Sequence, residues 1–202
     1  MKILHIESSI FAHNGQSSQL SRRLIAQLKS QQPAVEVVEK HFAAAPVPHF
    51  DADFLTALNT KQEQRTEKQQ QMVDFADQQI EDLESADILL IGLPMYNFGV
   101  PSMLKSWFDF VARAGVTFRY TENGPEGLVK NKKAIIVATR GGLYKGTPAD
   151  SQTTFVSTFL NFIGIEDIEW VYAEGLNMGE ETKQLAFSGA EQELLKIAAA
   201  VQ

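Results

Sequence analysis

Short apolar runs alternate with longer amphipathic stretches along this chain, and the alternation constrains the fold more than any other feature of the sequence. Five runs of five or six residues have the length and the Val and Ile content of strands buried in a parallel sheet. They are 2–6, 35–39, 88–93, 134–139 and 168–173. Between the runs, apolar residues recur at helical spacing, as Leu20, Leu24 and Leu28 do. The pattern predicts an α/β fold, a doubly wound five-stranded parallel sheet with helices on both faces.

The chain has 202 residues, which suits one domain, and we expect a single domain over 1–202. No internal repeat and no linker rich in Ser, Gly or Pro divides it. Two connections, 41–60 and 114–132, are longer than ordinary loops. The first is a long link that contains Pro46 and Pro48. The second contains a strand-like alternation at 117–120 and a turn at 122–125.

Composition excludes several kinds of function. The chain has no cysteine, so it can form no disulfide, no thiolate-held iron–sulfur cluster and no cysteine-based zinc site, and we expect no metal. The net charge of −7 and the absence of a basic stripe argue against binding to nucleic acid. No run of about 20 apolar residues predicts insertion into a membrane. The N-terminus does not read as a signal peptide, so a cytoplasmic protein is expected.

Ligands of open parallel sheets bind beyond the carboxyl ends of the strands, and three unusual segments follow the first, third and fourth predicted strands. With the strand order 2-1-3-4-5, these three strands are neighbours. The first segment, 7–20, is rich in hydroxyl and amide groups and opens a helix, with Ser17 or Ser18 as the expected N-cap. Such a loop can hold a phosphate through hydroxyls and backbone N–H groups, or it can be an ordinary capped turn. It has neither a Walker sequence nor the G-x-G-x-x-G fingerprint.

The other two segments suit a flat ring. Residues 94–101 mix aromatic and amide side chains, and Pro101 is expected at the first position of a helix. Their aromatic residues Tyr96 and Phe98 are alternatively core anchors. In the segment 139–144, the pair Gly141 and Gly142 lets the backbone approach a ligand closely, or forms a plain turn.

Taken together, these segments resemble the FMN-dependent NADH azoreductases, also called NADH:quinone oxidoreductases, of the flavodoxin-like superfamily. The resemblance covers essentially the whole chain. Stretches 94–98 and 108–128 are its most specific parts, and the Ser/Gln loop, Arg140-Gly141-Gly142 and 159–164 also match. It implies a flavodoxin-like fold, a bound FMN and a homodimer with two sites at its interface.

The resemblance also implies roles for single residues. The FMN phosphate would be held by Ser9, Gly15, Gln16 and Ser17. The isoalloxazine ring would be lined by Met95, Tyr96, Asn97 and Phe98, and its pyrimidine edge contacted by Thr139, Arg140, Gly141 and Gly142. Substrate would meet Asn97 at the reactive edge and, from the partner chain, Phe118, Tyr120, Phe162 and Phe50. The alternative for these aromatic residues, above all for Phe162, is ordinary packing. Family members commonly have Ser where this chain has Gly15 and Thr139, and Gly15 keeps its N–H group for the phosphate.

The activity that the resemblance implies is a two-electron transfer from NADH or NADPH, with NADH favoured, to quinones and aromatic azo compounds by a ping-pong mechanism. The chemistry would take place on the flavin, so no side chain is expected to be catalytic. His13 lies on the phosphate loop, where a cation would help, and His5 is expected to be structural. The alternatives are a flavodoxin-like carrier that delivers single electrons to a protein partner and a dimeric interaction protein without flavin.

Overall fold

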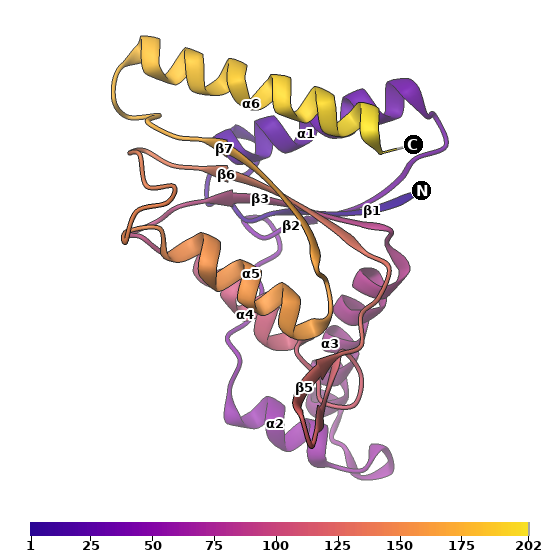
Figure 1. Cartoon of the computed structure of the whole chain (residues 1–202). Coiled ribbons are helices and arrows are strands. Elements are labelled where there is room, and N and C mark those ends of the chain that lie inside the picture. The colour runs from indigo at the N-terminus through magenta and orange to yellow at the C-terminus, as the bar shows by residue number, and fades with distance from the viewer. Residues whose placement is uncertain (202) are drawn as a thin grey trace.

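The computed structural model describes residues 1–201 and is built around one five-stranded parallel sheet (Figure 1). Its strands are β1 (Lys2–Glu7), β2 (Glu36–His41), β3 (Ile88–Pro94), β6 (Lys133–Thr139) and β7 (Asp167–Ala173). They lie in the order β2-β1-β3-β6-β7, and all neighbours are parallel. Counted along the chain, this is the order 2-1-3-4-5, so the expected strands and their arrangement are confirmed.

Helices cover both faces of the sheet, as the amphipathic stretches predict (Figure 1). One face carries α1 (Gln16–Gln31) and α6 (Glu180–Ala200), and the other α3 (Glu67–Ser85), α4 (Ser102–Val111) and α5 (Ser151–Ile163). Each interface is a separate buried cluster. Leu24 and Leu194 belong to the first, and Trp107 and Leu160 to the second. The apolar side chains that set the helical period are therefore the ones that hold the helices to the sheet.

The two long connections both contain regular structure. The long link 41–60 contains α2 (Ala52–Asn59) and is followed by the short helix η2 (Gln62–Gln64). Its N-cap is Asp51, whose carboxylate accepts a hydrogen bond from the Phe54 N–H at 2.9 Å. With only two buried side chains, the helix shows little apolar periodicity. The second connection forms an antiparallel hairpin of β4 (Phe118–Thr121) and β5 (Gly124–Gly127), close to the predicted strand and turn.

Two helices begin at other positions than expected. The short helix η1 (Ala12–Asn14) leads into Gly15, which is the N-cap of α1, so the expectation of Ser17 or Ser18 as N-cap is wrong. The extended backbone of Gly15 lets its carbonyl accept the Gln19 N–H at 2.9 Å, which starts the helix earlier. Both serines therefore lie inside the first turn. Pro101 is the N-cap of α4 rather than its first residue.

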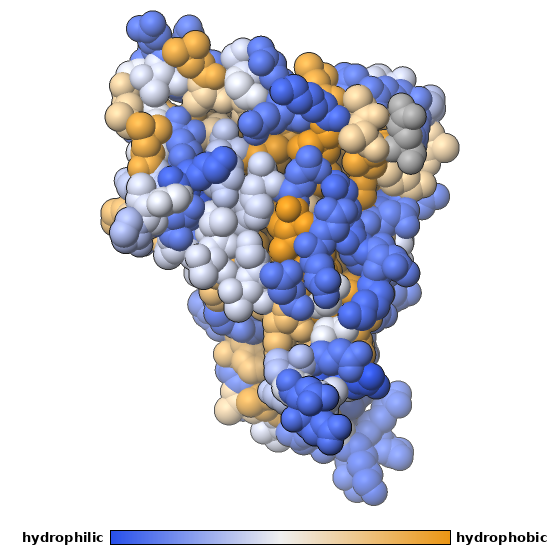
Figure 2. Space-filling model, in the orientation of Figure 1, coloured by the Kyte–Doolittle hydropathy of each residue, from blue (hydrophilic) through white to orange (hydrophobic). Residues whose placement is uncertain are grey.

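Hydrophilic residues cover most of the side of the molecule in Figure 2, and hydrophobic residues show in scattered patches. Within residues 1–201, no helix combines the length and the apolar character that a membrane crossing needs.

Gly189, an exposed residue inside α6, is a site where stability can be raised. A Cβ atom there would have no other group within 4 Å, and the backbone is helical. We expect Gly189→Ala to raise the free energy of unfolding by about 0.5–1 kcal/mol, measured by urea denaturation, because glycine is a poor helix former. Gly179→Ala is the contrasting control and should destabilise, since Gly179 has φ = 112°. Equal effects of the two substitutions would contradict this account.

Candidate cofactor-binding site

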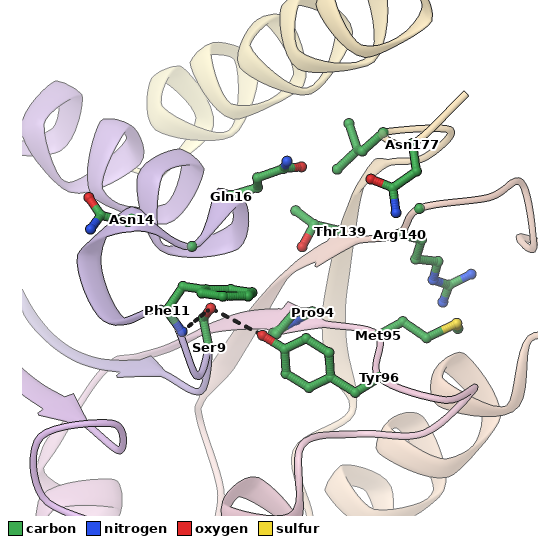
Figure 3. Close-up of a pocket in the computed structure, with 13 residues that line it drawn as sticks. Ser9, Phe11, Asn14, Gln16, Pro94, Met95, Tyr96, Thr139, Arg140 and Asn177 are labelled. Carbon is green, nitrogen blue, oxygen red and sulfur yellow. Dashed lines mark hydrogen bonds between the residues drawn. The ribbon is translucent and has the colours of Figure 1, made fainter. Parts of the chain in front are cut away.

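A cleft of about 300 Å³ opens beyond the carboxyl ends of β1, β3 and β6, where the three unusual segments meet (Figure 3). Its volume is at the lower end of the range, roughly 300–1,000 Å³, that is usual for small-molecule sites. The predicted residues in its lining are Ser9, Gly15, Gln16, Met95, Tyr96, Thr139, Arg140 and Gly141. It is also lined by Phe11, Asn14, Pro94, Leu176 and Asn177, which the sequence analysis did not single out. The cleft therefore joins parts of all three loops.

The N-terminus of α1 is equipped to bind an anion. Gln19 is the first residue whose N–H bonds back into the helix, so the N–H groups of Gln16, Ser17 and Ser18 have no acceptor within it. The Ser17 side chain is fully buried, and its hydroxyl has no hydrogen-bond partner among the described residues. Unpaired donors and the positive end of the helix dipole in one place favour a phosphate. The N–H of Gly15 does not join them, because it donates to the Ala12 carbonyl at 3.1 Å.

Ser9 connects the loop after β1 to the loop after β3. Its hydroxyl lies 3.2 Å from the Tyr96 hydroxyl and accepts a hydrogen bond from the Phe11 N–H at 3.2 Å (Figure 3). Ser9 also packs against Gly15, where an added Cβ would lie only 2.2 Å from the Ser9 Oγ. Glycine at position 15 thus permits a contact that a larger residue would break.

The segment after β3 folds into a tight turn. Tyr96 and Gly99 exchange two backbone hydrogen bonds, of 3.2 and 3.0 Å, and the two residues between them have positive φ angles, 49° at Asn97 and 63° at Phe98. Positive φ is uncommon for a residue with a Cβ, above all for an aromatic one. Phe98 is 56% exposed and is not a core anchor. Asn97 and Phe98 thus lie at an exposed tip and do not line the cleft in this chain.

Gln152 on α5 holds this turn, and the sequence analysis missed it. Its side chain is buried, and its Nε2 donates to the Pro94 carbonyl at 2.8 Å and to the Gly99 carbonyl at 2.9 Å. One amide therefore closes the turn from behind. No local sequence signal could have revealed it, because Gln152 is far from the turn in sequence and lies in an ordinary helical pattern.

Arg140 has a structural role that differs from the expected one. Its buried guanidinium points away from Ser9 and Gln16 (Figure 3). It donates to Asp150 Oδ1 at 2.7 Å and to Glu174 Oε1 at 3.1 Å, and it lies over the ring of Tyr172. Arg140 borders the cleft, but its charged group is committed to this ion cluster.

The paired glycines follow β6, and of the two Gly141 lines the opposite wall of the cleft. The Gly141 carbonyl accepts the Asn177 N–H and the Gly142 carbonyl accepts the Gly175 N–H, both at 3.0 Å. Within residues 1–201, neither glycine N–H donates to another residue. A Cβ on Gly141 would meet the Asn177 amide at 2.5 Å, and one on Gly142 would meet the Tyr144 ring at 2.8 Å. Of these two N–H groups without a partner among residues 1–201, that of Gly141 belongs to a residue of the cleft wall.

The aromatic residues expected at the substrate site do not line the cleft of the same chain. Phe118 on the hairpin is buried, its ring 4.3 Å from that of Phe162 at the end of α5. Tyr120 is 76% exposed, and its ring stands edge-on to Phe118. Phe50 packs against Phe54 of α2. The hairpin and α2 lie together at one end of the molecule, away from the loops that form the cleft (Figure 1).

The ion cluster around Arg140 gives a pH prediction. Burial raises the pKa of Asp150, but hydrogen bonds from Arg140 and Thr153 outweigh burial and hold it below its ordinary value. Because the pKa of Asp150 is lower in the folded than in the unfolded protein, its ionised carboxylate stabilises the fold above about pH 4. This contribution to stability is lost as the pH falls through the pKa of the folded protein. We expect wild type to exceed Asp150→Asn in free energy of unfolding at neutral pH, and the difference to shrink below about pH 4. A difference that stays constant with pH in urea denaturation would contradict this expectation.

Comparison with known proteins agrees with this fold. A family model described as "Flavodoxin-like fold" matches residues 1–198. An "FMN-dependent NADH:quinone oxidoreductase" of Cellvibrio japonicus is 50% identical over 192 residues, covering 95% of this chain and 96% of the relative. One of Alcanivorax borkumensis is 48% identical, covering 96% and 98%. Among solved structures, that of azoreductase AzrA has a TM-score of 0.89 at 27% identity, with 99% of this chain and 100% of that chain covered.

Proposed function

The chain belongs to the family of FMN-dependent NADH:quinone oxidoreductases with a flavodoxin-like fold, and from this premise we propose that it reduces quinones and aromatic azo compounds with electrons from NADH. The observation that supports FMN as cofactor is the buried, unpaired Ser17 hydroxyl beside the free N–H groups of Gln16, Ser17 and Ser18. The site fits a phosphate because it offers uncharged donors at a helix N-terminus and no carboxylate lines the cleft.

When bound, FMN supplies the redox chemistry by accepting a hydride from the nicotinamide and passing two electrons on to the acceptor. The role of the chain is to bind and orient the cofactor. The first turn of α1 would hold the phosphate, and the turn 95–98 would flank the ring, with Asn97 reaching its reactive edge from the exposed tip of that turn. The N–H groups of Gly141 and Gly142 would contact the pyrimidine edge and stabilise negative charge there, as preorganised backbone donors do.

Within this proposal the two substrates use one binding place in turn, which makes the mechanism ping-pong. NADH, a proton and the quinone are consumed, and NAD⁺ and the hydroquinone are formed. No side chain lining the cleft is a histidine, an acid or a lysine, so the additional proton comes from water. Flat walls of backbone and aromatic groups accept many planar molecules, so we expect a broad range of planar acceptors to be reduced.

We also propose that the protein works in the cytoplasm as a homodimer. Exposed Tyr120, together with Phe118, Phe162 and Phe50, lies apart from the cleft of its own chain. A second chain would bring these rings to the outer face of the flavin, where a planar substrate stacks. This arrangement gives the four aromatic residues a role that they do not have within one chain.

An anaerobic absorption titration of FMN-loaded protein tests the proposal. Addition of NADH should bleach the flavin directly to its two-electron-reduced form, and benzoquinone should restore the colour. A parallel titration with NADPH ranks the two donors, and NADH is expected to react faster. Flavin that binds but stays oxidised with both donors would favour a single-electron carrier, and failure to bind flavin would exclude both redox functions.

A further inference from the structure

Three potential metal ligands meet at the carboxyl ends of β1 and β2, outside the lining of the cleft. Glu7 ends β1, His41 ends β2, and His13 lies in η1. The Nδ1 atoms of both histidines lie 3.0 Å from the same oxygen, Oε2 of Glu7. The two imidazole rings stand edge-on with centroids 5.0 Å apart. Two ring nitrogens thus converge on one carboxylate oxygen.

Glu7 is a firmly placed ligand. Its side chain is only 1% exposed, and its other oxygen, Oε1, is paired with Nε of Arg22 on α1. This ion pair orients the carboxylate and leaves Oε2 free for the histidines. Other charged groups near the cluster are few: Glu39 contacts His41, and the buried His5 lies 3.8 Å from Glu39. With neutral imidazoles, the two carboxylates and one arginine leave the cluster with an excess negative charge.

Glu39 lies behind His41. Nε2 of His41 lies 3.2 Å from Oε2 of Glu39. With Nε2 donating to Glu39, Nδ1 is the ring nitrogen left to bind a metal ion beside Oε2 of Glu7, from which it lies 3.0 Å. A carboxylate that holds the outer nitrogen of a histidine is also the usual surrounding of a histidine bound to a metal.

We propose that Glu7, His13 and His41 bind a divalent transition-metal ion of the zinc class. Their ligand atoms all lie within 4.8 Å of one another. Bonds of about 2.0–2.2 Å to a tetrahedral zinc ion place the ligand atoms a little over 3 Å apart, so small side-chain rotations complete the site. The His13 side chain is 58% exposed, so the fourth position faces solvent and takes water. Two imidazoles favour zinc over calcium or magnesium, which prefer oxygen ligands.

The ion would act as a clamp. It would tie η1 to the ends of β1 and β2, and η1 immediately precedes Gly15 and the free N–H groups of α1. The sequence analysis expected no metal, and it could not have found this cluster, because residues 7, 13 and 41 lie on three elements and have no ligand-spacing motif. The inference does not depend on the redox chemistry proposed above.

A zinc competition titration tests the site directly. The protein is used FMN-loaded, freed of any histidine tag, and stripped of metal with a chelator. Zn²⁺ is then distributed between the protein and a colorimetric indicator. We expect one tight zinc site per chain. The zinc affinity should be at least tenfold weaker in His13→Ala and in His41→Ala, and Ca²⁺ or Mg²⁺ should not change it. Glu39→Gln should weaken binding by roughly 10- to 100-fold, as loss of a carboxylate behind a histidine ligand does.

His49→Ala is the matched control, because His49 is an exposed histidine outside the cluster, and it should leave the zinc affinity unchanged. Circular dichroism confirms that each variant is folded, and an unchanged FMN content shows that a lower zinc affinity does not come from loss of FMN. The proposal is overturned if wild-type protein does not compete with the indicator. It is equally overturned if both single histidine variants bind zinc as tightly as wild type.

Discussion

Arg140→Met should lower the free energy of unfolding by about 3–5 kcal/mol, the usual cost of removing one partner from a buried ion pair. The guanidinium is fully buried and faces two carboxylates, so the substitution leaves Asp150 and Glu174 without their cation. Methionine keeps most of the side-chain volume, which isolates the loss of charge. Urea denaturation at neutral pH measures the effect.

Lys145→Met is the matched control. Lys145 is an exposed cation that lies over the same ring, Tyr172, at 4.4 Å. Its removal should cost less than about 1 kcal/mol, because exposed cation–π contacts are weak. If the two variants lost similar stability, burial would not be the reason for the importance of Arg140. An FMN affinity much reduced in folded Arg140→Met would instead indicate that the guanidinium takes part in FMN binding.

Ser17→Asp should weaken FMN binding by more than about 100-fold, which corresponds to roughly 2.8 kcal/mol. The new carboxylate would take the free N–H groups at the start of α1 and repel the phosphate dianion. The apo fold should survive, since an acidic residue in the first turn of a helix interacts favourably with the helix dipole. Quenching of FMN fluorescence measures the affinity, and circular dichroism of the apo protein checks the fold.

Two companion variants sharpen this result. Ser17→Ala removes only a charge-assisted hydrogen bond and should weaken FMN binding by roughly 10- to 100-fold. Ser30→Asp places the same carboxylate at the exposed far end of α1 and should leave the affinity unchanged. Full FMN affinity in both Ser17 variants would show that the phosphate binds elsewhere.

Features that depend on local pattern were predictable from the sequence. The five strands, the helices on both faces and the hairpin after 114 follow from apolar spacing and turn residues, although β2 and β7 are partly exposed edge strands. The strand order followed from a common arrangement of such sheets and from the family resemblance. The start of α1 was missed because Ser17 and Ser18 are good caps, and only the extended backbone at Gly15 shows where the first helical hydrogen bond begins.

Features that depend on contacts between distant segments were not predictable. Gln152 closes the turn at 96–99 from another helix, and Asn177 enters the cleft wall from the loop after β7. The resemblance placed Arg140 in the stretch that contacts the pyrimidine edge, and only the structure shows that its guanidinium pairs with Asp150 and Glu174 on other segments. A linear motif identifies which loop approaches a ligand and does not tell which way each side chain turns.

The separation of the cleft from the four aromatic residues has a consequence for the order of assembly. The first turn of α1 and the loops after β3 and β6 meet within one chain, so we expect capture of the cofactor not to depend on a second copy. If the rings of a second copy complete the substrate face, turnover per chain should fall on dilution below the dissociation constant of the dimer, while the cofactor stays bound. A newly synthesised chain would then bind its cofactor first and become active only after dimerisation.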